Sequence, residues 1–560
     1  MTGVATKPWM PGHGPYVHCD GSRGNREVHR GLQPMMPYHG RPSFGINDGP
    51  RYTMSTPLQL DGQALAIDEV VQVARHGRDV SIGNTGLQKL VRAREVVDAA
   101  CSRSTAVYGV NTGFGSLSRM RIDADDLKQV QCNLVRSHAA GVGDTLDTAT
   151  TRGMMLLLAA SLCRGHSGVR PEVVQLLVDL LNTGITPVIP SRGSVGASGD
   201  LAPLSHLAQV LIGEGEVTID GAWMLTAEAM QAHDVTPIEL AAKEGLALIN
   251  GTHMMASLAS LAVADARLLF DAALKAAAMA IDAARATDSF LDPRLHEARN
   301  QAGQCEVAAI LADLLSGSGI LQAHLEDDPR VQDPYCLRAS PQVLGAALDA
   351  INHVDQIVTR ELGAVTDNPL VFPGDHEQSE FVSGGNFHGM PLAIAMDTLA
   401  IALAHVAGIS ERRVNWILSA LDSENPVTAH LSTDPGLHSG LMITQYTAAA
   451  LCNELQGLAT PASVRNIPTC AGMEDYNSMG ATSSLQAASA IELSRNVIAI
   501  ELLVMAEAIE HQRPHESGDG VERIHEQVRQ QVPRLDGDRS PSPDIQLLAD
   551  LIGQGWFQKD

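Results

Sequence analysis

The sequence predicts a mainly α-helical protein, with a small mixed α/β N-terminal region followed by a bundle of long helices. Three observations favour this fold class. Hydrophobic residues form 44% of the 560 residues but aromatic residues only 3%, a mix that suits packed helices better than sheets. Apolar residues recur at helical spacing over unusually long segments. Glycine and proline punctuate the chain between those segments.

The N-terminal region is expected to hold short elements joined by loops. Asp61-Gly62 lies between two short apolar segments, a pattern typical of a hairpin. The expected elements, in order, are hairpin strands at 58–60 and 64–66, helices beginning near 68 and near 88, a β-prone segment at 106–110, and a helix over 173–181 followed by a loop from 183 to 199.

The C-terminal part is expected to form the bundle. Such long helices leave broad apolar stripes for contact between subunits. The helical segments are about 252–287, 342–363, 386–419, 439–460 and 477–511. Three regions follow from this organisation: a disordered extension at 1–53, an N-terminal domain at 54–248 that carries the reactive loop described below, and a helical bundle domain at 249–560.

Charge and cysteine content exclude several classes of function. A net charge of −25 disfavours nucleic acid and anionic membrane surfaces as partners. The eight cysteines include no C-x-x-C pair, so neither a zinc site nor a disulfide framework is indicated. With no signal peptide and no transmembrane run, the chain is expected to be a cytoplasmic enzyme that acts on a small molecule.

The segment GSVGASGDLAP at 193–203 contains a tripeptide, Ala197-Ser198-Gly199, that can become an electrophile by itself. A tight turn would press the Gly199 amide nitrogen against the Ala197 carbonyl carbon, and a five-membered ring can then close. Loss of water from the ring and from Ser198 leaves a 4-methylidene-imidazol-5-one. Gly199 suits this role because it has no side chain to block the approach.

A helix is expected to begin directly after this tripeptide. Asp200 suits an N-cap and Pro203 suits a first helical turn. The positive end of that helix would favour electron density on the ring. The alternative to a modified tripeptide is an ordinary flexible loop, because Ala-Ser-Gly is a common tripeptide. A serine-hydrolase elbow is disfavoured, since the G-x-S-x-G spacing is missing.

The segment resembles the cofactor-forming loop of the aromatic amino acid ammonia-lyases, the group of histidine, phenylalanine and tyrosine ammonia-lyases and related aminomutases. The resemblance runs from about Met54 to the C-terminus and implies the long-helix bundle of that family. Further motifs recur in the same order: YGVNTGFG at 108–115, SHAAG at 137–141, NGT at 250–252, QDPYCLR at 332–338, TDNP at 366–369 and GGNFHG at 384–389.

The resemblance also implies roles for single residues. Elimination of ammonia needs a base for a barely acidic β-hydrogen, and Tyr108 is the candidate. Arg338 offers a planar fork for the substrate carboxylate. Glu454 lies in an apolar helical segment, where a carboxylate is costly unless paired, so it is expected to receive the amine or an imidazole. Further expected pocket residues are Tyr335 near the ring, Asn250 as a partner of the ring oxygen or of the amine, Gln332, Asn386 and Phe387.

His138 indicates the substrate. A Ser-His pair at 137–138 is similar to the histidine ammonia-lyases, which implies conversion of L-histidine to trans-urocanate. Three departures keep phenylalanine, tyrosine or a 2,3-aminomutase reaction open: NELQ at 453–456, no histidine after Glu474-Asp475, and His253 where those enzymes commonly have glutamine.

The resemblance implies a homotetramer whose active sites are shared among three chains, with no external cofactor and no metal. Two other classes stay open. One is a helical lyase of the fumarase-like kind that works without a modified loop, and the other is a noncatalytic scaffold.

Overall fold

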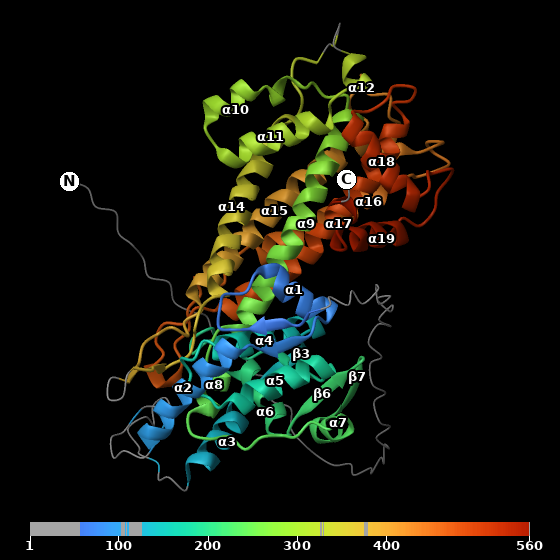
Figure 1. Cartoon of the computed structure of the whole chain (residues 1–560). Coiled ribbons are helices and arrows are strands. Elements are labelled where there is room, and N and C mark those ends of the chain that lie inside the picture. Colours follow the sequence, from blue (N-terminus) through green and yellow to red (C-terminus); the bar gives the residue numbers. More distant parts are fainter. Residues whose placement is uncertain are drawn as a thin grey trace, which may run out of the picture. The chain divides into compact units, whose positions relative to one another are not determined.

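The structure is a computed structural model. It describes residues 56–101, 107, 109–110, 112, 122, 126–324, 328, 330–374 and 379–558. Residues 52–560 form one compact unit. Helices dominate it, as the sequence predicts (Figure 1).

The N-terminal part contains short helices and small sheets. Its helices are α1 (Ile67–His76), α2 (Asn84–Cys101), α3 (Leu127–His138), α4 (Thr148–Leu162), α5 (Pro171–Thr183), α6 (Ala202–Leu211), α7 (Thr226–Ala232) and α8 (Glu244–Ile249). Its strands are β1 (Leu58–Leu60), β2 (Val80–Ile82), β3 (Val142–Thr145), β4 (Thr186–Pro187), β5 (Pro190–Arg192), β6 (Glu216–Ile219) and β7 (Ala222–Leu225).

The C-terminal part is built on long helices. These are α9 (His253–Ala283), α14 (Ser340–Glu361), α15 (Met390–Ser419), α16 (Met442–Leu458) and α17 (Gly480–Glu510). Shorter elements complete it: α10 (Pro293–Arg299), α11 (Ala302–Leu314), α12 (Gly319–Gln322), α13 (Tyr335–Arg338), β8 (Leu370–Phe372), β9 (Glu380–Val382), α18 (Asp519–Gln531) and α19 (Ser542–Gly553). Each of the five predicted long segments is thus a helix.

Helix α9 is the central element of the core. It packs against α14, α15 and α17 and also against α1 and α4, so it joins the bundle to the N-terminal part (Figure 1). Its sequence is rich in alanine and leucine, and it is buried on nearly every side, as expected for a helix without a polar face. The boundary expected at residue 249 falls just before α9 and stays a prediction.

The hairpin prediction at the N-terminus is wrong. Strand β1 pairs in parallel with β2, with Leu58 opposite Val80, and α1 makes the crossover between them. Asp61 does not turn the chain back; its carboxylate accepts the backbone N–H of Thr85 at 3.0 Å, at the start of α2. The turn residues Asp61-Gly62 therefore predicted the wrong partner strand for β1.

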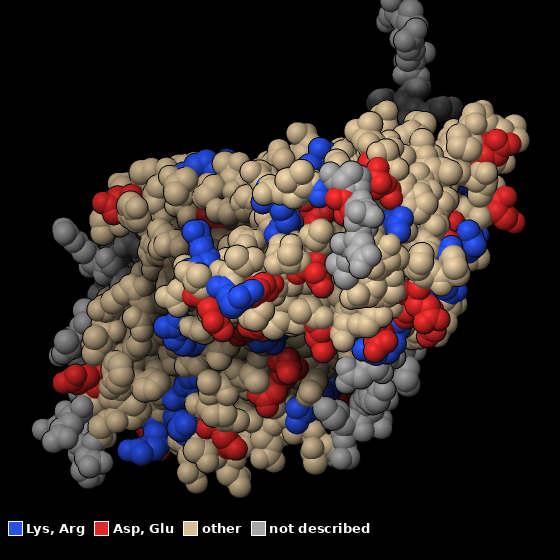
Figure 2. All heavy atoms as spheres, turned by 90° about the horizontal axis from the view of Figure 1, so that it is seen from above, with Lys and Arg blue, Asp and Glu red and all other residues tan. Residues whose placement is uncertain are grey.

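Surface chemistry is mixed on the face shown in Figure 2, where acidic and basic side chains are interspersed over a larger area of other residues. Helices α15 and α16 expose several large apolar side chains, Ile394, Ile401, Ile443 and Tyr446. Within the described ranges, α15 alone is long and apolar enough to cross a bilayer, but most of it is buried in the bundle. That burial is what a core helix shows.

Candidate active site

The Ala197-Ser198-Gly199 loop adopts a tight, strained turn between β5 and α6. The backbone φ angle is +59° at Ser198, +73° at Gly199 and +49° at Leu201. Positive φ is uncommon for residues other than glycine. The Ser194 hydroxyl ties the two ends of the turn, because it accepts the Gly196 N–H at 3.2 Å and donates to the Gly199 carbonyl at 3.3 Å.

Gly199 is pressed against Gly251, at the entrance to α9. The Gly251 N–H donates to the Ser198 carbonyl at 3.2 Å, and the Asp200 N–H donates to the Gly251 carbonyl at 2.7 Å. A Cβ added at Gly199 would lie 1.9 Å from the Gly251 oxygen, so no other residue fits. Among the described residues, nothing accepts a hydrogen bond from the Gly199 amide, which leaves that nitrogen free to react.

A second segment holds the loop from its other side. The Gly196 carbonyl accepts the Gly389 N–H at 3.0 Å and the Ser478 hydroxyl at 2.7 Å. The predicted pocket residues Asn386 and Phe387 belong to the segment that ends at Gly389, so the structure brings that segment to the loop. Asn386 is exposed and Phe387 is partly buried.

Asp200 does not cap the helix that follows it, contrary to the prediction. Its buried carboxylate instead accepts the backbone N–H groups of Met254, at 2.5 Å, and Met255, at 3.4 Å, which open α9. The positive φ at Leu201 turns the chain, and Leu201 itself occupies the N-cap position of α6 without a side-chain hydrogen bond. Burial raises the pKa of Asp200 to about 8, although both backbone hydrogen bonds lower it.

Asn250 lies next to Gly251 and is almost fully buried. Its Nδ2 donates to Asp367 Oδ1 at 3.1 Å and to the Asn368 carbonyl at 3.2 Å. Its Oδ1 is buried and has no partner in the described structure. Asp367 in turn binds Lys243 Nζ at 2.6 Å, with both side chains buried. Sequence reasoning missed Lys243 and Asp367, although Asp367 belongs to the quoted TDNP motif.

His138 lies at the end of α3, four residues before strand β3. Strand β3 pairs antiparallel with β5, with Val142 opposite Arg192, so Gly141 at the end of the SHAAG motif lies beside Gly193, the first residue of the loop segment. His138 Nδ1 lies 2.9 Å from the Leu134 carbonyl oxygen. The Ser137 hydroxyl lies 3.0 Å from the same nitrogen. Because a carbonyl only accepts, the Leu134 contact favours the tautomer with the proton on Nδ1, in which Nε2 is an acceptor.

Three predicted residues meet in a separate hollow. Gln332, Tyr335 and Arg338 line a cavity of about 740 Å³ beside Trp416 and Asp422. The Arg338 guanidinium stacks over the Tyr335 ring at 4.5 Å, and its Nε donates to the Asp333 carbonyl at 2.8 Å. The Tyr335 side chain is largely exposed, at 72%.

This hollow lies far from the reactive loop within one chain. Helix α14 begins at Ser340, two residues after Arg338, and ends at Glu361, which accepts the Thr252 hydroxyl beside Gly251. With a rise of 1.5 Å per residue, the two ends of α14 are separated by roughly 30 Å. A single chain therefore does not bring Arg338 or Tyr335 to Ser198, and the predicted position of Tyr335 near the ring is not met in one chain.

Glu454 lies on α16, as expected, and its side chain is exposed in the single chain. The helix buries its opposite face, which carries Ala448, Cys452 and Leu455. Cys452 contacts the Ala407 carbonyl of α15, 17 residues past Met390 at the loop end of that helix. Glu454 thus lies roughly 25 Å from the loop along the bundle.

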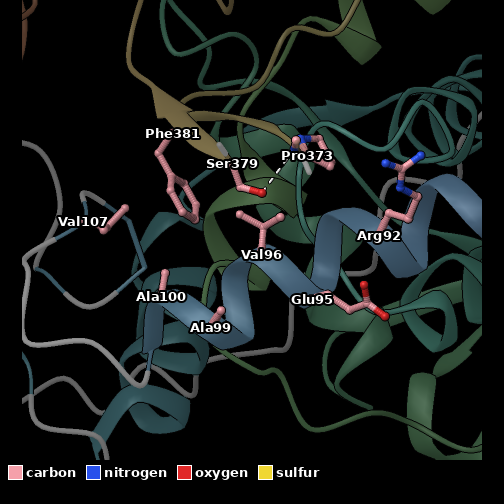
Figure 3. Close-up of a pocket in the computed structure, with 10 residues that line it drawn as sticks. Arg92, Glu95, Val96, Ala99, Ala100, Val107, Pro373, Ser379 and Phe381 are labelled. Carbon is pink, nitrogen blue, oxygen red and sulfur yellow. Dashed lines mark hydrogen bonds between the residues drawn. The ribbon is translucent and has the colours of Figure 1, made fainter. Parts of the chain in front are cut away.

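Tyr108 lies outside the described residues. Its neighbour Gly109 has a φ of +72°, and a Cβ there would lie 2.4 Å from Leu246 of α8 and 3.5 Å from Pro369. A further cavity of about 360 Å³ lies between α2 and the β8–β9 hairpin, where Val96, Ala99 and Phe381 face it (Figure 3). None of the predicted site residues that the structure describes lines that cavity.

A model for the family described as aromatic amino acid lyase matches residues 65–530. The chain belongs to the aromatic amino acid lyase family. Among relatives of this lyase, a protein named histidine ammonia-lyase from Symbiobacterium thermophilum is 46% identical over 494 residues, which are 88% of this chain and 96% of that protein.

Solved structures agree in fold. A histidine ammonia-lyase from Trypanosoma cruzi superposes with a TM-score of 0.82 at 38% identity, covering 90% of this chain and 94% of that one. A tyrosine aminomutase from Streptomyces globisporus gives 0.84 at 36% identity, covering 90% and 98%. The lyase fold predicted from the motifs is therefore confirmed.

Proposed function

We propose that the chain is a histidine ammonia-lyase that converts L-histidine to trans-urocanate and ammonia. The observation that carries this proposal is the buried turn at Ala197-Ser198-Gly199, where Gly199 approaches Gly251 too closely for any side chain. Curated relatives named histidine ammonia-lyase at 42–46% identity over most of the chain support the substrate.

The residues present fit an internal methylidene-imidazolone. The turn places a small residue, a hydroxyl-bearing residue and a glycine in the order that ring closure and dehydration require, and their backbone is held by Gly251 and Gly389. When formed, this group supplies an electrophile for the amine of the substrate. The chain needs no external cofactor for that chemistry.

The other residues bind the substrate and move the proton. Tyr108 takes the β-hydrogen as general base. Asn250 presents a buried, unpartnered carboxamide oxygen to the amine. Arg338 binds the carboxylate with its planar guanidinium, and Glu454 receives the amine or the imidazole. Tyr335, Gln332, Asn386 and Phe387 shape the pocket around these groups.

His138 selects the imidazole. Its Nε2 is an acceptor in the neutral ring, because Nδ1 faces the Leu134 carbonyl, and an acceptor suits the N–H of an imidazole side chain better than a phenyl ring. The aminomutase neighbour is 36% identical, whereas the histidine lyase of Symbiobacterium thermophilum is 46% identical. Phenylalanine, tyrosine and aminomutase reactions are therefore less favoured.

The active site is composite, in a homotetramer. Within one chain the reactive loop is far from both the Arg338 hollow and exposed Glu454, and α15 and α16 expose apolar side chains that a neighbouring copy would cover. The described cysteines are all free thiols, which fits a cytoplasmic enzyme.

The function is tested with purified protein and a panel of L-histidine, L-phenylalanine and L-tyrosine. We expect the fastest release of conjugated product from L-histidine, and an intact mass lower than the sequence mass by about two water molecules. Ser198→Ala should fold, lack the mass deficit and lose nearly all turnover. Full turnover by Ser198→Ala would favour a lyase without the modified loop, and no product from the whole panel would favour a scaffold.

The composite site is tested by complementation. Ser198→Ala and Arg338→Met should each be inactive alone. If the loop and the arginine of one site come from different copies, random co-assembly in equal amounts restores about one quarter of the sites. Inactive mixed assemblies would place both groups on the same chain.

A further inference from the structure

The Asn250 carboxamide has one allowed orientation in this structure. Its two contacts on one side are the Asp367 carboxylate and the Asn368 carbonyl, at 3.1 and 3.2 Å. Both are acceptors, so the NH₂ group must face them, and the oxygen must face the other way. That oxygen is buried without a partner, and an unpaired buried acceptor is costly.

A buried ion pair fixes Asp367 in turn. Lys243 Nζ binds Asp367 Oδ2 at 2.6 Å, and the exposed fractions of the two side chains are 0% and 4%. The Asn368 N–H and Asn250 Nδ2 share the other oxygen, Oδ1. Both oxygens of Asp367 are thus committed, and neither can turn away from Asn250 without breaking a buried charge pair.

We infer that Lys243 and Asp367 are positioning residues that hold the Asn250 oxygen out as a hydrogen-bond acceptor for the substrate amine. This inference rests on the proposed function and decides between two roles for Asn250. With its NH₂ group occupied, Asn250 accepts from the amine and does not donate to an oxygen of the ring.

The test is Asp367→Asn in the full-length, assembled enzyme. Lys243 requires an acceptor, so the new carboxamide turns its oxygen to Lys243 and its NH₂ group to Asn250. Asn250 thereby loses its acceptor at position 367 and keeps only the Asn368 carbonyl, so its oxygen is no longer held towards the substrate. Loss of a hydrogen bond to a charged amine, about 1.5–3 kcal/mol, lowers kcat/KM about 10- to 150-fold.

Two measurements separate this role from a structural one. The inhibition constant of the deaminated product should stay within about twofold, because the product has no amine to bind Asn250. The mass deficit of about two waters should be retained in the variant. Equal losses of product affinity and kcat/KM, or a missing mass deficit, would overturn the inference.

A double variant gives the sharpest outcome. In Lys243→Met/Asp367→Asn the carboxamide at 367 is free to turn its oxygen back to Asn250, so kcat/KM should recover about tenfold over Asp367→Asn. A structural role predicts that the double variant is worse. The matched control is Arg529→Met, which removes a buried ion pair with Glu507 between α18 and α17, remote from Asn250, and should leave kcat/KM unchanged.

The substrate assignment does not decide this test. All three amino acids of the panel carry the same amine, so the variants are measured with whichever the parent converts fastest. A parent that prefers phenylalanine would contradict the proposed function and leave the inference about Asn250 standing. Parental kcat/KM in a folded Asp367→Asn enzyme would contradict the inference alone.

Discussion

Replacement of Gly199 by alanine tests the contact that shapes the reactive loop. The added Cβ would lie 1.9 Å from the Gly251 oxygen and 2.1 Å from the Gly251 carbonyl carbon. Both are backbone atoms at the buried entrance to α9, so they cannot rotate away as a side chain would. Gly251 must move by more than about 1 Å to reach an ordinary contact.

The cost can be estimated from the structure. A left-handed residue with a Cβ costs about 1–2 kcal/mol, and Gly199 has a φ of +73°. Displacing Gly251 breaks its hydrogen bonds with Ser198 and Asp200, which are worth about 1 kcal/mol each. We therefore expect Gly199→Ala to lower the free energy of unfolding by about 3–4 kcal/mol.

Gly184 provides a matched control. It follows α5 with a φ of +79°, and a Cβ there would meet nothing within 4 Å. Gly184→Ala should therefore cost only the left-handed penalty, about 1–2 kcal/mol, and should keep the mass deficit. Urea unfolding and intact mass are measured for both variants. The reasoning is refuted if Gly199→Ala keeps the full mass deficit and is no less stable than Gly184→Ala.

Three further predictions concern buried and substrate-binding side chains. Burial raises the pKa of Asp200 to about 8 from 3.8, so its contribution to stability is present below about pH 4 and is lost as the pH rises to about 8. Relative to the parent, the free energy of unfolding of Asp200→Asn should therefore rise by up to about 5 kcal/mol between pH 4 and pH 9. Urea unfolding measures this difference, and parallel pH profiles of the two proteins would contradict it. Burial, with a smaller effect of Arg164, lowers the pKa of His253 to about 3 from 6.5, so the contribution of His253 to stability is lost as the pH falls from about 6.5 towards 3. Between pH 7 and pH 5 the free energy of unfolding of the parent should fall by about 2 kcal/mol more than that of His253→Gln. Equal decreases in the two proteins would argue against a buried neutral ring. Arg338→Lys should raise KM at least about tenfold, because lysine cannot form the bidentate contact with a carboxylate; an unchanged KM in steady-state assays would remove Arg338 from the substrate site.

Much of the fold could be predicted because helical periodicity is local. The segment expected at 342–363 is the helix Ser340–Glu361, and the one expected at 477–511 is Gly480–Glu510. The pairing of β1 could not be predicted in the same way. Its partner β2 lies beyond a crossover helix, and the turn residues Asp61-Gly62 carry no information about a strand that distant.

Local rules also failed at the site, for a physical reason. The N-cap rule for Asp200 assumes that the chain enters α6 directly, but Leu201 has a φ of +49°. That turn sends the Asp200 carboxylate to the N-terminus of another helix, α9. The ion pair of Lys243 with Asp367 joins positions 124 residues apart. The sequence around each of these residues gives no signal from which this pairing could be predicted.

The predicted site residues divide into groups whose separation follows from helix length. A residue directly before the first turn of α14 is held roughly 30 Å from one that contacts its last turn, whatever its side chain. Arg338 precedes α14, whereas Glu361 ends it beside Thr252. A motif predicts that a residue serves the reaction but not which copy of the chain provides it. If Arg338 binds the carboxylate of a substrate held at Ser198, rigid helices require that it come from a neighbouring subunit.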